Sequence, residues 1–162
     1  MTDLVIEQLV KRNEKTSDKL KKTGLVLLTA FVGFASFLIK YVMLLTIALI
    51  IADYIIFRRM DIEYEYVYFN GDLDIDKIMS RELRKRMFST NIKEVEIIAP
   101  TGNQAVLCCQ HIKELDYSIN NPEVTTYEMV TMFKGEKVRV KFNPNEKILK
   151  AMKDLAPRKV II

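Results

Sequence analysis

The sequence has few of the residues that build disulfide frameworks, metal centres and catalytic triads. Its 162 residues include one histidine, His111, and two cysteines, which are adjacent at positions 108 and 109. Such a pair forms no disulfide framework, and a domain without one fits a reducing cytosol. Neighbouring side chains on a strand point to opposite faces, and a structural zinc site needs four ligands. The pattern therefore favours buried packing of Cys108 and Cys109 over a metal site formed with His111.

Recognisable catalytic patterns are also missing. The sequence contains no glycine-rich phosphate loop, serine nucleophile elbow or zinc-protease helix. Asp72, Asp74 and Asp76 have the spacing of a calcium loop, but the required glycine and glutamate positions are Lys77 and Leu83. Most catalytic triads would have to use His111, which lies in no partner motif. We therefore predict no enzymatic activity, no cofactor and no metal.

Positive charge is concentrated near the N-terminus. Residues 1–23 carry six Lys and Arg against four acids, residues 24–60 carry three against one, and residues 61–162 carry sixteen against sixteen. A duplex-binding domain is expected to carry its own basic excess. The neutral C-terminal part therefore argues against a nucleic-acid partner, and the basic residues are typical of the flanks of a membrane segment.

The longest apolar stretch covers residues 24–57, where only Lys40 and Asp53 are charged. One helix of that length would measure about 50 Å, whereas the hydrocarbon core of a bilayer is about 30 Å thick. The length favours a transmembrane hairpin with short spans at 24–38 and 42–57. One long tilted helix and a buried soluble hairpin are the alternatives. Asp53 is expected to reach the interface or Arg58.

The flanking charges predict the orientation of this hairpin. Basic residues precede the first span and follow the second, whereas the turn carries only Lys40. The positive-inside rule then predicts a multi-pass protein of the cell membrane with both termini in the cytoplasm. Apolar residues at 4–6 and 9–10 suit one face of a helix within a basic amphipathic segment, residues 1–23. That segment could lie on the bilayer, the distal domain or a partner.

The pattern after residue 60 changes to a period of two. Tyr64, Tyr66 and Tyr68 alternate with other residues before Asn70-Gly71, the strongest short signal of a β-hairpin. A two-residue turn pairs Tyr68 with Leu73 and Tyr66 with Ile75, which matches the apolar faces.

About seven short antiparallel strands and one helix are predicted in this part. The further strands are expected at 84–90, 92–99, 106–110, 114–119, 127–133 and 136–142. The closing helix is expected to begin with Asn143 as N-cap, Pro144 at the first helical position and Glu146 completing a capping box.

This order of elements resembles the pleckstrin-homology-like barrel of bacterial membrane-anchored proteins. The stretch 66–78, which includes Asn-Gly-Asp-Leu-Asp-Ile-Asp-Lys-Ile, and the basic run from Arg81 to Arg86 resemble a family of small uncharacterised bacterial membrane proteins. The resemblance implies two adjacent N-terminal spans and a cytoplasmic domain, but no activity. It divides the chain into residues 1–23, the hairpin at 24–57, a mostly β domain at 61–156 and a tail at 157–162.

One cluster, Arg81, Arg84, Lys85 and Arg86, is a candidate contact for anionic lipid or a partner. Guanidinium groups suit phosphate because they donate two hydrogen bonds at once. An alternative is structural, since Glu65 and Asp76 would face each other across the first hairpin and Arg84 or Arg86 could balance them.

The function predicted from the sequence is a membrane-anchored, non-enzymatic binding or interaction module at the cytoplasmic face. The expected partners are the lipid bilayer and an unidentified membrane or cytoplasmic protein, with further copies of the chain as another candidate. The alternatives are a structural subunit of a membrane complex that uses the two spans as its interface, and a module that binds anionic lipid headgroups.

Overall fold

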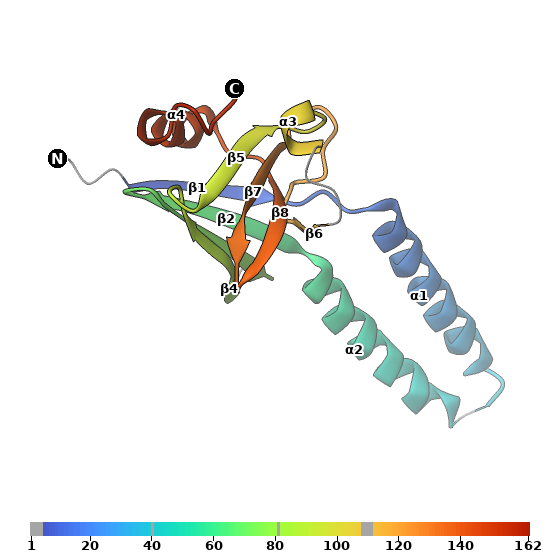
Figure 1. The fold of residues 1–162 in the computed structure, drawn as a ribbon. Helices are drawn as coiled ribbons and strands as arrows, with labels where there is room; N and C mark the ends of the chain where they lie inside the picture. Colours follow the sequence, from blue (N-terminus) through green and yellow to red (C-terminus); the bar gives the residue numbers. More distant parts are fainter. Residues whose placement is uncertain (1–4, 40, 81, 108–111) are drawn as a thin grey trace.

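Two four-stranded sheets pack against each other, and a helical hairpin projects from one end (Figure 1). The computed structural model describes residues 5–39, 41–80, 82–107 and 112–162. Sheet A contains, in spatial order, β1 (Val5–Lys11), β2 (Ile62–Phe69), β3 (Asp72–Met79) and β4 (Leu83–Asn91). Sheet B contains β5 (Val95–Pro100), β7 (Tyr127–Phe133), β8 (Glu136–Phe142) and β6 (Lys113–Asp116). The helices are α1 (Thr16–Ala35), α2 (Val42–Met60), α3 (Gln104–Leu107) and α4 (Glu146–Leu155).

The predicted hairpin at Asn70-Gly71 is confirmed. Both turn residues have positive φ, 46° at Asn70 and 98° at Gly71. Tyr68 pairs with Leu73, and residues 66 and 75 pair as expected. Alternation therefore places the tyrosines of β2 on the inner face of sheet A, where they are buried.

The remaining strands follow the prediction in part. The strands at 127–133 and 136–142 are confirmed, and β4 covers 84–90. The strand expected at 92–99 starts only at Val95. Residues 104–107 form α3 instead of a strand, because the Asn103 side chain accepts a hydrogen bond from the Ala105 amide and starts a helical turn. Pairing of β6 with β8 is parallel, so the prediction of an entirely antiparallel domain is wrong.

The closing helix is present, but its N-cap is Asn145 rather than Asn143. The Asn145 side chain accepts a hydrogen bond from the Ile148 amide at 2.8 Å. Asn143 is buried and joins two loops, since it accepts from the Ile119 amide and donates to the Thr125 carbonyl. Either of the asparagines that flank Pro144 suits the N-cap position by residue type. The loop contacts that select Asn145 come from residues distant in sequence.

The N-terminal segment begins with a strand, so the prediction of a helical face there is wrong. β1 pairs with β2 along its whole length, from Val5 opposite Phe69 to Lys11 opposite Glu63. The apolar pairs in this segment suit a strand as well as a helix, and the edge of β2 decides between them. Sheet A therefore contains chain from both sides of the helical hairpin.

The prediction of a transmembrane hairpin is also wrong. None of the helices that the structure describes is long and apolar enough to cross a membrane. Lys19, Lys21 and Lys22 lie in the first half of α1, while Asp53 and the two arginines at its end interrupt α2. The apolar runs that remain are shorter than the about 20 residues that a spanning helix needs. The predicted multi-pass membrane location, with both termini cytoplasmic, is overturned by the same finding.

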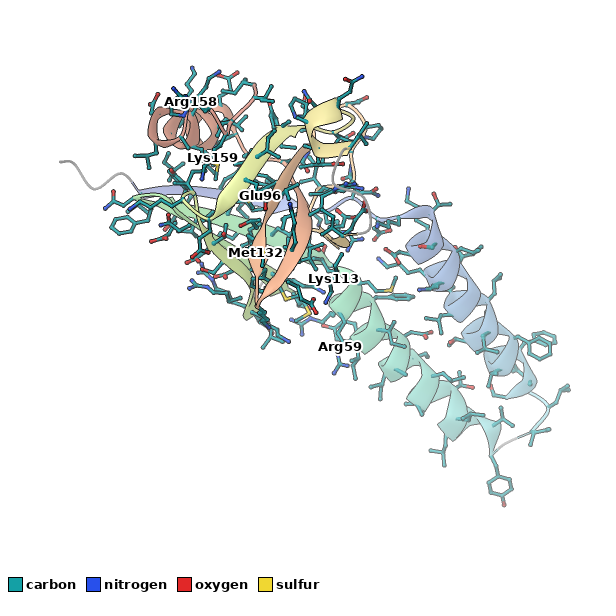
Figure 2. The ribbon with its side chains drawn as sticks, in the orientation of Figure 1. Arg59, Glu96, Lys113, Met132, Arg158 and Lys159 are labelled. Carbon is teal, nitrogen blue, oxygen red and sulfur yellow. The ribbon has the colours of Figure 1, made fainter. Side chains whose placement is uncertain are left out.

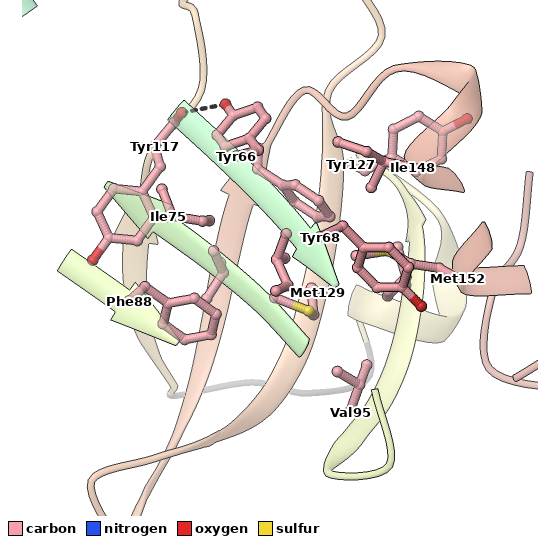
Figure 3. Close-up of a cluster of buried hydrophobic side chains, with 14 of the residues drawn as sticks. Tyr66, Tyr68, Ile75, Phe88, Val95, Tyr117, Tyr127, Met129, Ile148 and Met152 are labelled. Atoms are coloured by element: carbon pink, nitrogen blue, oxygen red, sulfur yellow. Dashed lines mark hydrogen bonds between the residues drawn. The ribbon is translucent and has the colours of Figure 1, made fainter. Parts of the chain in front are cut away.

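The core lies between the two sheets and under α4 (Figure 3). Tyr66, Ile75 and Phe142 are fully buried there, and the rings of Tyr66 and Phe142 meet edge to face with centroids 6.0 Å apart. The Tyr66 hydroxyl donates a hydrogen bond to the Tyr117 carbonyl at 2.7 Å. Ile148 and Met152 of α4 close the open end of the barrel.

Candidate functional site

The outer face of sheet A carries a row of carboxylates. Glu65 of β2 lies directly opposite Asp76 of β3, as the hairpin register predicts. Asp76 is buried although it belongs to the outer face. A shift in the pairing of β3 with β4, between Ile75 and Asp76, places this carboxylate between two arginines.

Arg84 and Arg86 are both engaged by these acids. The Arg84 Nε lies 2.7 Å from Asp76 Oδ2, and the same guanidinium contacts Glu65. Arg86 lies 3.2 Å from Asp76 Oδ1 and 3.0 Å from Asp74 Oδ2. The hydrogen bond to Asp76 raises the pKa of Arg84. These contacts are the charge balance that the structural interpretation of the cluster expects.

Lys85 does not join this surface. Lys85 lies opposite Lys77 in the pairing of β3 with β4. Alternation along β4 points its side chain to the face opposite that of Arg84 and Arg86. Burial lowers the pKa of Lys77, and the nearby charges of Arg12 and Lys85 lower it further. Arg81 lies outside the described residues. Anionic-lipid binding by the four residues stays a prediction.

A groove lies between β1 and the start of α4. It has a volume of about 840 Å³, and its lining combines strand residues Val5, Ile6 and Glu7 with helix residues Asn145, Glu146, Lys147, Lys150, Ala151 and Asp154. The Gln8 side chain fixes the two walls together, because it donates to the Asn143 carbonyl at 2.9 Å and accepts from the Asn145 amide at 2.7 Å. The groove is therefore a built feature of the barrel.

The helical hairpin buries a polar pair and exposes apolar side chains, which is the reverse of the arrangement in the barrel. Asp53 is buried between the helices and accepts a hydrogen bond from the Thr29 hydroxyl at 2.6 Å. Arg58, the partner expected for Asp53, contacts Glu82 of the barrel at 2.8 Å instead. This contact and its hydrogen bond raise the pKa of Arg58.

Most of the apolar side chains of the hairpin point away from it. Figure 2 shows the side chains of α1 and α2 projecting outward along both helices, with Arg59 at the end near the barrel. Nineteen large apolar side chains of the described hairpin are exposed, among them Phe31 and Phe34 of α1 and Phe37, which follows its end. A shallow groove of about 560 Å³ runs along the hairpin over Ala30, Gly33 and Thr46.

A catalytic or metal centre is not evident in the part of the chain that the structure describes. There, no three His, Cys, Asp or Glu side chains are grouped so that they could hold a metal ion. Cys108, Cys109 and His111 lie outside the described residues. The structural features that the sequence did not reveal are the strand edge of β1 and the groove beside α4. Residues 5–11 contain two apolar pairs rather than an alternating pattern, so the sequence holds no clear signal of this strand.

Comparison with known families adds one finding. Residues 2–162 match a family described as Bacterial PH-like domain (DUF6106). No curated protein and no solved structure is similar enough to count as a match. The match covers the hairpin as well as the barrel, so both parts are features of the family.

Proposed function

Because the chain belongs to the bacterial PH-like domain family, we propose that it is a non-enzymatic interaction module that self-associates through its helical hairpin. The observation that carries this proposal is the exposed apolar surface of α1 and α2. The largest apolar patch of a monomer usually covers about 300–600 Å². A fully exposed large aromatic side chain presents about 150 Å² or more, so nineteen half-exposed apolar side chains exceed that range.

A second copy of the hairpin is the occupant that the surface fits best. A stable interface takes about 800 Å² from each partner, and one side of the hairpin supplies that area. Gly33 and Ala30 line the groove, and small residues let a second helix approach closely. Two hairpins can then form a four-helix bundle with an apolar interior.

Charge at the base of the hairpin favours an antiparallel pair. Lys19, Lys21, Arg58 and Arg59 all lie in the halves of the helices near the barrel. A parallel pair would bring these cations of the two copies together, and would also bring the two barrels to the same end. An antiparallel pair places them at opposite ends, beside apolar tip residues such as Phe37.

Binding of lipid headgroups by the basic cluster has less support. Arg84 and Arg86 already contact Glu65, Asp74 and Asp76, and a phosphate would have to displace these carboxylates. The Lys85 side chain points to the opposite face of β4 from these two arginines. The barrel is therefore proposed to bind a protein partner while the hairpin joins the copies.

Sedimentation equilibrium of the full-length chain tests the proposal. We expect a dimer that Gly33→Leu weakens by about tenfold or more, because a leucine fills the groove where the second helix docks. The added Cβ at Gly33 meets only Thr46 Cγ2, at 3.5 Å, an ordinary van der Waals contact, and a thermal melt establishes that the variant is folded. Gly24→Leu, on the same helix with nothing within 4 Å of its Cβ, is the matched control and should leave the dimer unchanged.

Three results would contradict self-association. They are a monomer at all concentrations, equal weakening by the two glycine substitutions, and flotation of the monomeric chain with phosphatidylcholine vesicles.

A further inference from the structure

The outer edge of β1 is an open strand edge. β1 stands at the end of the strand order of sheet A, and β2 is its neighbour there. Arg12 donates its amide to the Ile62 carbonyl at 3.1 Å, in the register that β1 and β2 share. Bonded pairs of an antiparallel ladder recur at every second residue. The amides of Ile6, Gln8 and Val10 therefore face β2.

The amides of Glu7, Leu9 and Lys11 consequently face away from the sheet. Asn13 has the same phase, and its outward amide donates to the Ile119 carbonyl at 2.7 Å. This bond occupies the outward side just beyond the end of β1. Between positions 5 and 11, none of the described residues makes a backbone hydrogen bond to this edge.

The other sheet edges in the described part of the chain are covered more fully. Ile98 of β5 donates to the Lys159 carbonyl at 2.7 Å and accepts from the Ile161 amide at 2.8 Å. β4 lies against β7, where the hydroxyls of Thr90 and Thr131 are 3.1 Å apart. β6 is four residues long. β1 leaves an open edge of seven residues beside the groove, and natural sheets usually protect such an edge.

The groove beside α4 adds side-chain contacts to this edge. Val5 and Leu9 are 52% and 59% exposed, so apolar surface lies along the strand. Ile6 and Ala151 line the groove and also pack against the core. Its charged lining contains the carboxylates of Glu7, Glu146 and Asp154 against two lysines, one of which, Lys150, lies 3.9 Å from Glu146.

We propose that β1 and α4 bind an extended, basic peptide segment of another protein, which adds a fifth strand to sheet A. Addition of a strand gives affinity through main-chain hydrogen bonds and specificity through alternate side chains. The amides and carbonyls of Glu7 and Leu9 pair with the peptide. Its apolar side chains enter the groove beside Ile6 and Ala151, and its basic side chains lie on the other face of the sheet beside Glu7. This site is separate from the hairpin, and its test does not depend on self-association.

The probe is a ten-residue peptide of alternating valine and lysine, capped at both ends, added to the full-length chain. We expect saturable binding below about 1 mM. Amide hydrogen exchange should slow at Glu7 and Leu9, while Ile6 and Gln8, which already face β2, keep their rates. A peptide of alternating valine and glutamate should bind at least about tenfold more weakly, because its carboxylates lie beside the like charge of Glu7.

A pair of substitutions at Leu9 separates the backbone from the side chain. Leu9→Pro removes an outward amide, which an edge strand tolerates, and should weaken peptide binding about tenfold or more. Leu9→Ala keeps the amide and should bind within about threefold of the original chain. A thermal melt establishes that each variant is folded, and the exchange measurement on the unchanged chain stands if Leu9→Pro does not fold.

Several outcomes would overturn the inference. They are the absence of binding by the lysine peptide at about 1 mM, unchanged exchange at Glu7 and Leu9 under saturation, and equal binding by the proline and alanine variants. Equal affinity for the two peptides would overturn the basic character of the partner.

Discussion

The barrel and the hairpin solve the problem of apolar surface in opposite ways. The barrel encloses its tyrosines and aliphatic side chains between two sheets and α4, and it pairs its outward arginines with acids. The hairpin encloses one polar pair, Asp53 and Thr29, and exposes its apolar side chains. The barrel therefore buries most of its large apolar side chains within itself, whereas the hairpin leaves its own exposed. Under the proposed self-association, a second copy covers the surface of the hairpin.

The sharpest way to break this comparison is to truncate one phenylalanine in each part. Phe142 is 0% exposed in the barrel core, and Phe34 is 72% exposed on α1. Phe142→Ala should lower the free energy of unfolding by about 3–5 kcal/mol, because it removes buried surface and leaves a cavity. Phe34→Ala should leave the melting of the barrel unchanged and should weaken the dimer. Denaturant titrations followed by tyrosine fluorescence measure the first effect, and equal losses in the two variants would contradict the comparison.

A smaller effect is expected at the carboxylate row of sheet A. Asp76→Asn removes the charge that two arginines share, and should cost about 1–2 kcal/mol of folding free energy, since both guanidinium groups are half exposed. Asp74→Asn removes a single ion pair with Arg86 and should cost less than about 1 kcal/mol. Urea titration of the two variants measures the difference. A larger loss for Asp74→Asn would argue against Asp76 as the centre of this network.

The smallest effect at neutral pH concerns Tyr68. Burial, together with the nearby carboxylates of Asp72 and Asp154, raises its pKa to about 12. The folded chain then holds this proton more tightly than the unfolded chain does, whose tyrosines titrate near about 10. The stability from Tyr68 is complete below about pH 10 and falls as the pH rises toward about 12.

Tyr68→Phe tests this dependence. The variant should lose less stability than the original chain between about pH 10 and 12, because its side chain does not ionise. Thermal melts at several alkaline pH values measure the slope. Parallel slopes for the two proteins would show that the hydroxyl of Tyr68 does not contribute.

The sequence predicts those elements whose partners are close in the chain. The hairpin at Asn70-Gly71 and the strands at 127–142 follow from alternation and turn residues, and the register predicted for the first hairpin is correct. The mostly β character of the domain follows from the same pattern, and the resemblance of its element order to PH-like barrels agrees with the family match. Arg84 and Arg86 meet their acids because strands β2, β3 and β4 are consecutive.

Distant partners explain what the sequence does not predict. The sequence of β1 fits one face of a helix, and only its pairing with the edge of β2 makes it a strand. Asn145 rather than Asn143 caps α4 because Gln8, far away in the chain, holds the amide of residue 145. The direction of β6 depends on β8, since periodicity carries no information about whether neighbours run parallel. The groove and the open edge of β1 follow from these same distant contacts.

The insertion of the hairpin between β1 and β2 has a consequence for how the chain folds. Val5 pairs with Phe69 across the whole hairpin, a connection that would be costly in entropy if the intervening chain were a flexible loop. Helices form locally and quickly, and the two antiparallel helices bring their outer ends close together. The loop that must close is then short in effect, although β1 and β2 remain distant in sequence. A preformed helical hairpin would thus lower the entropic cost of forming the first strand pair.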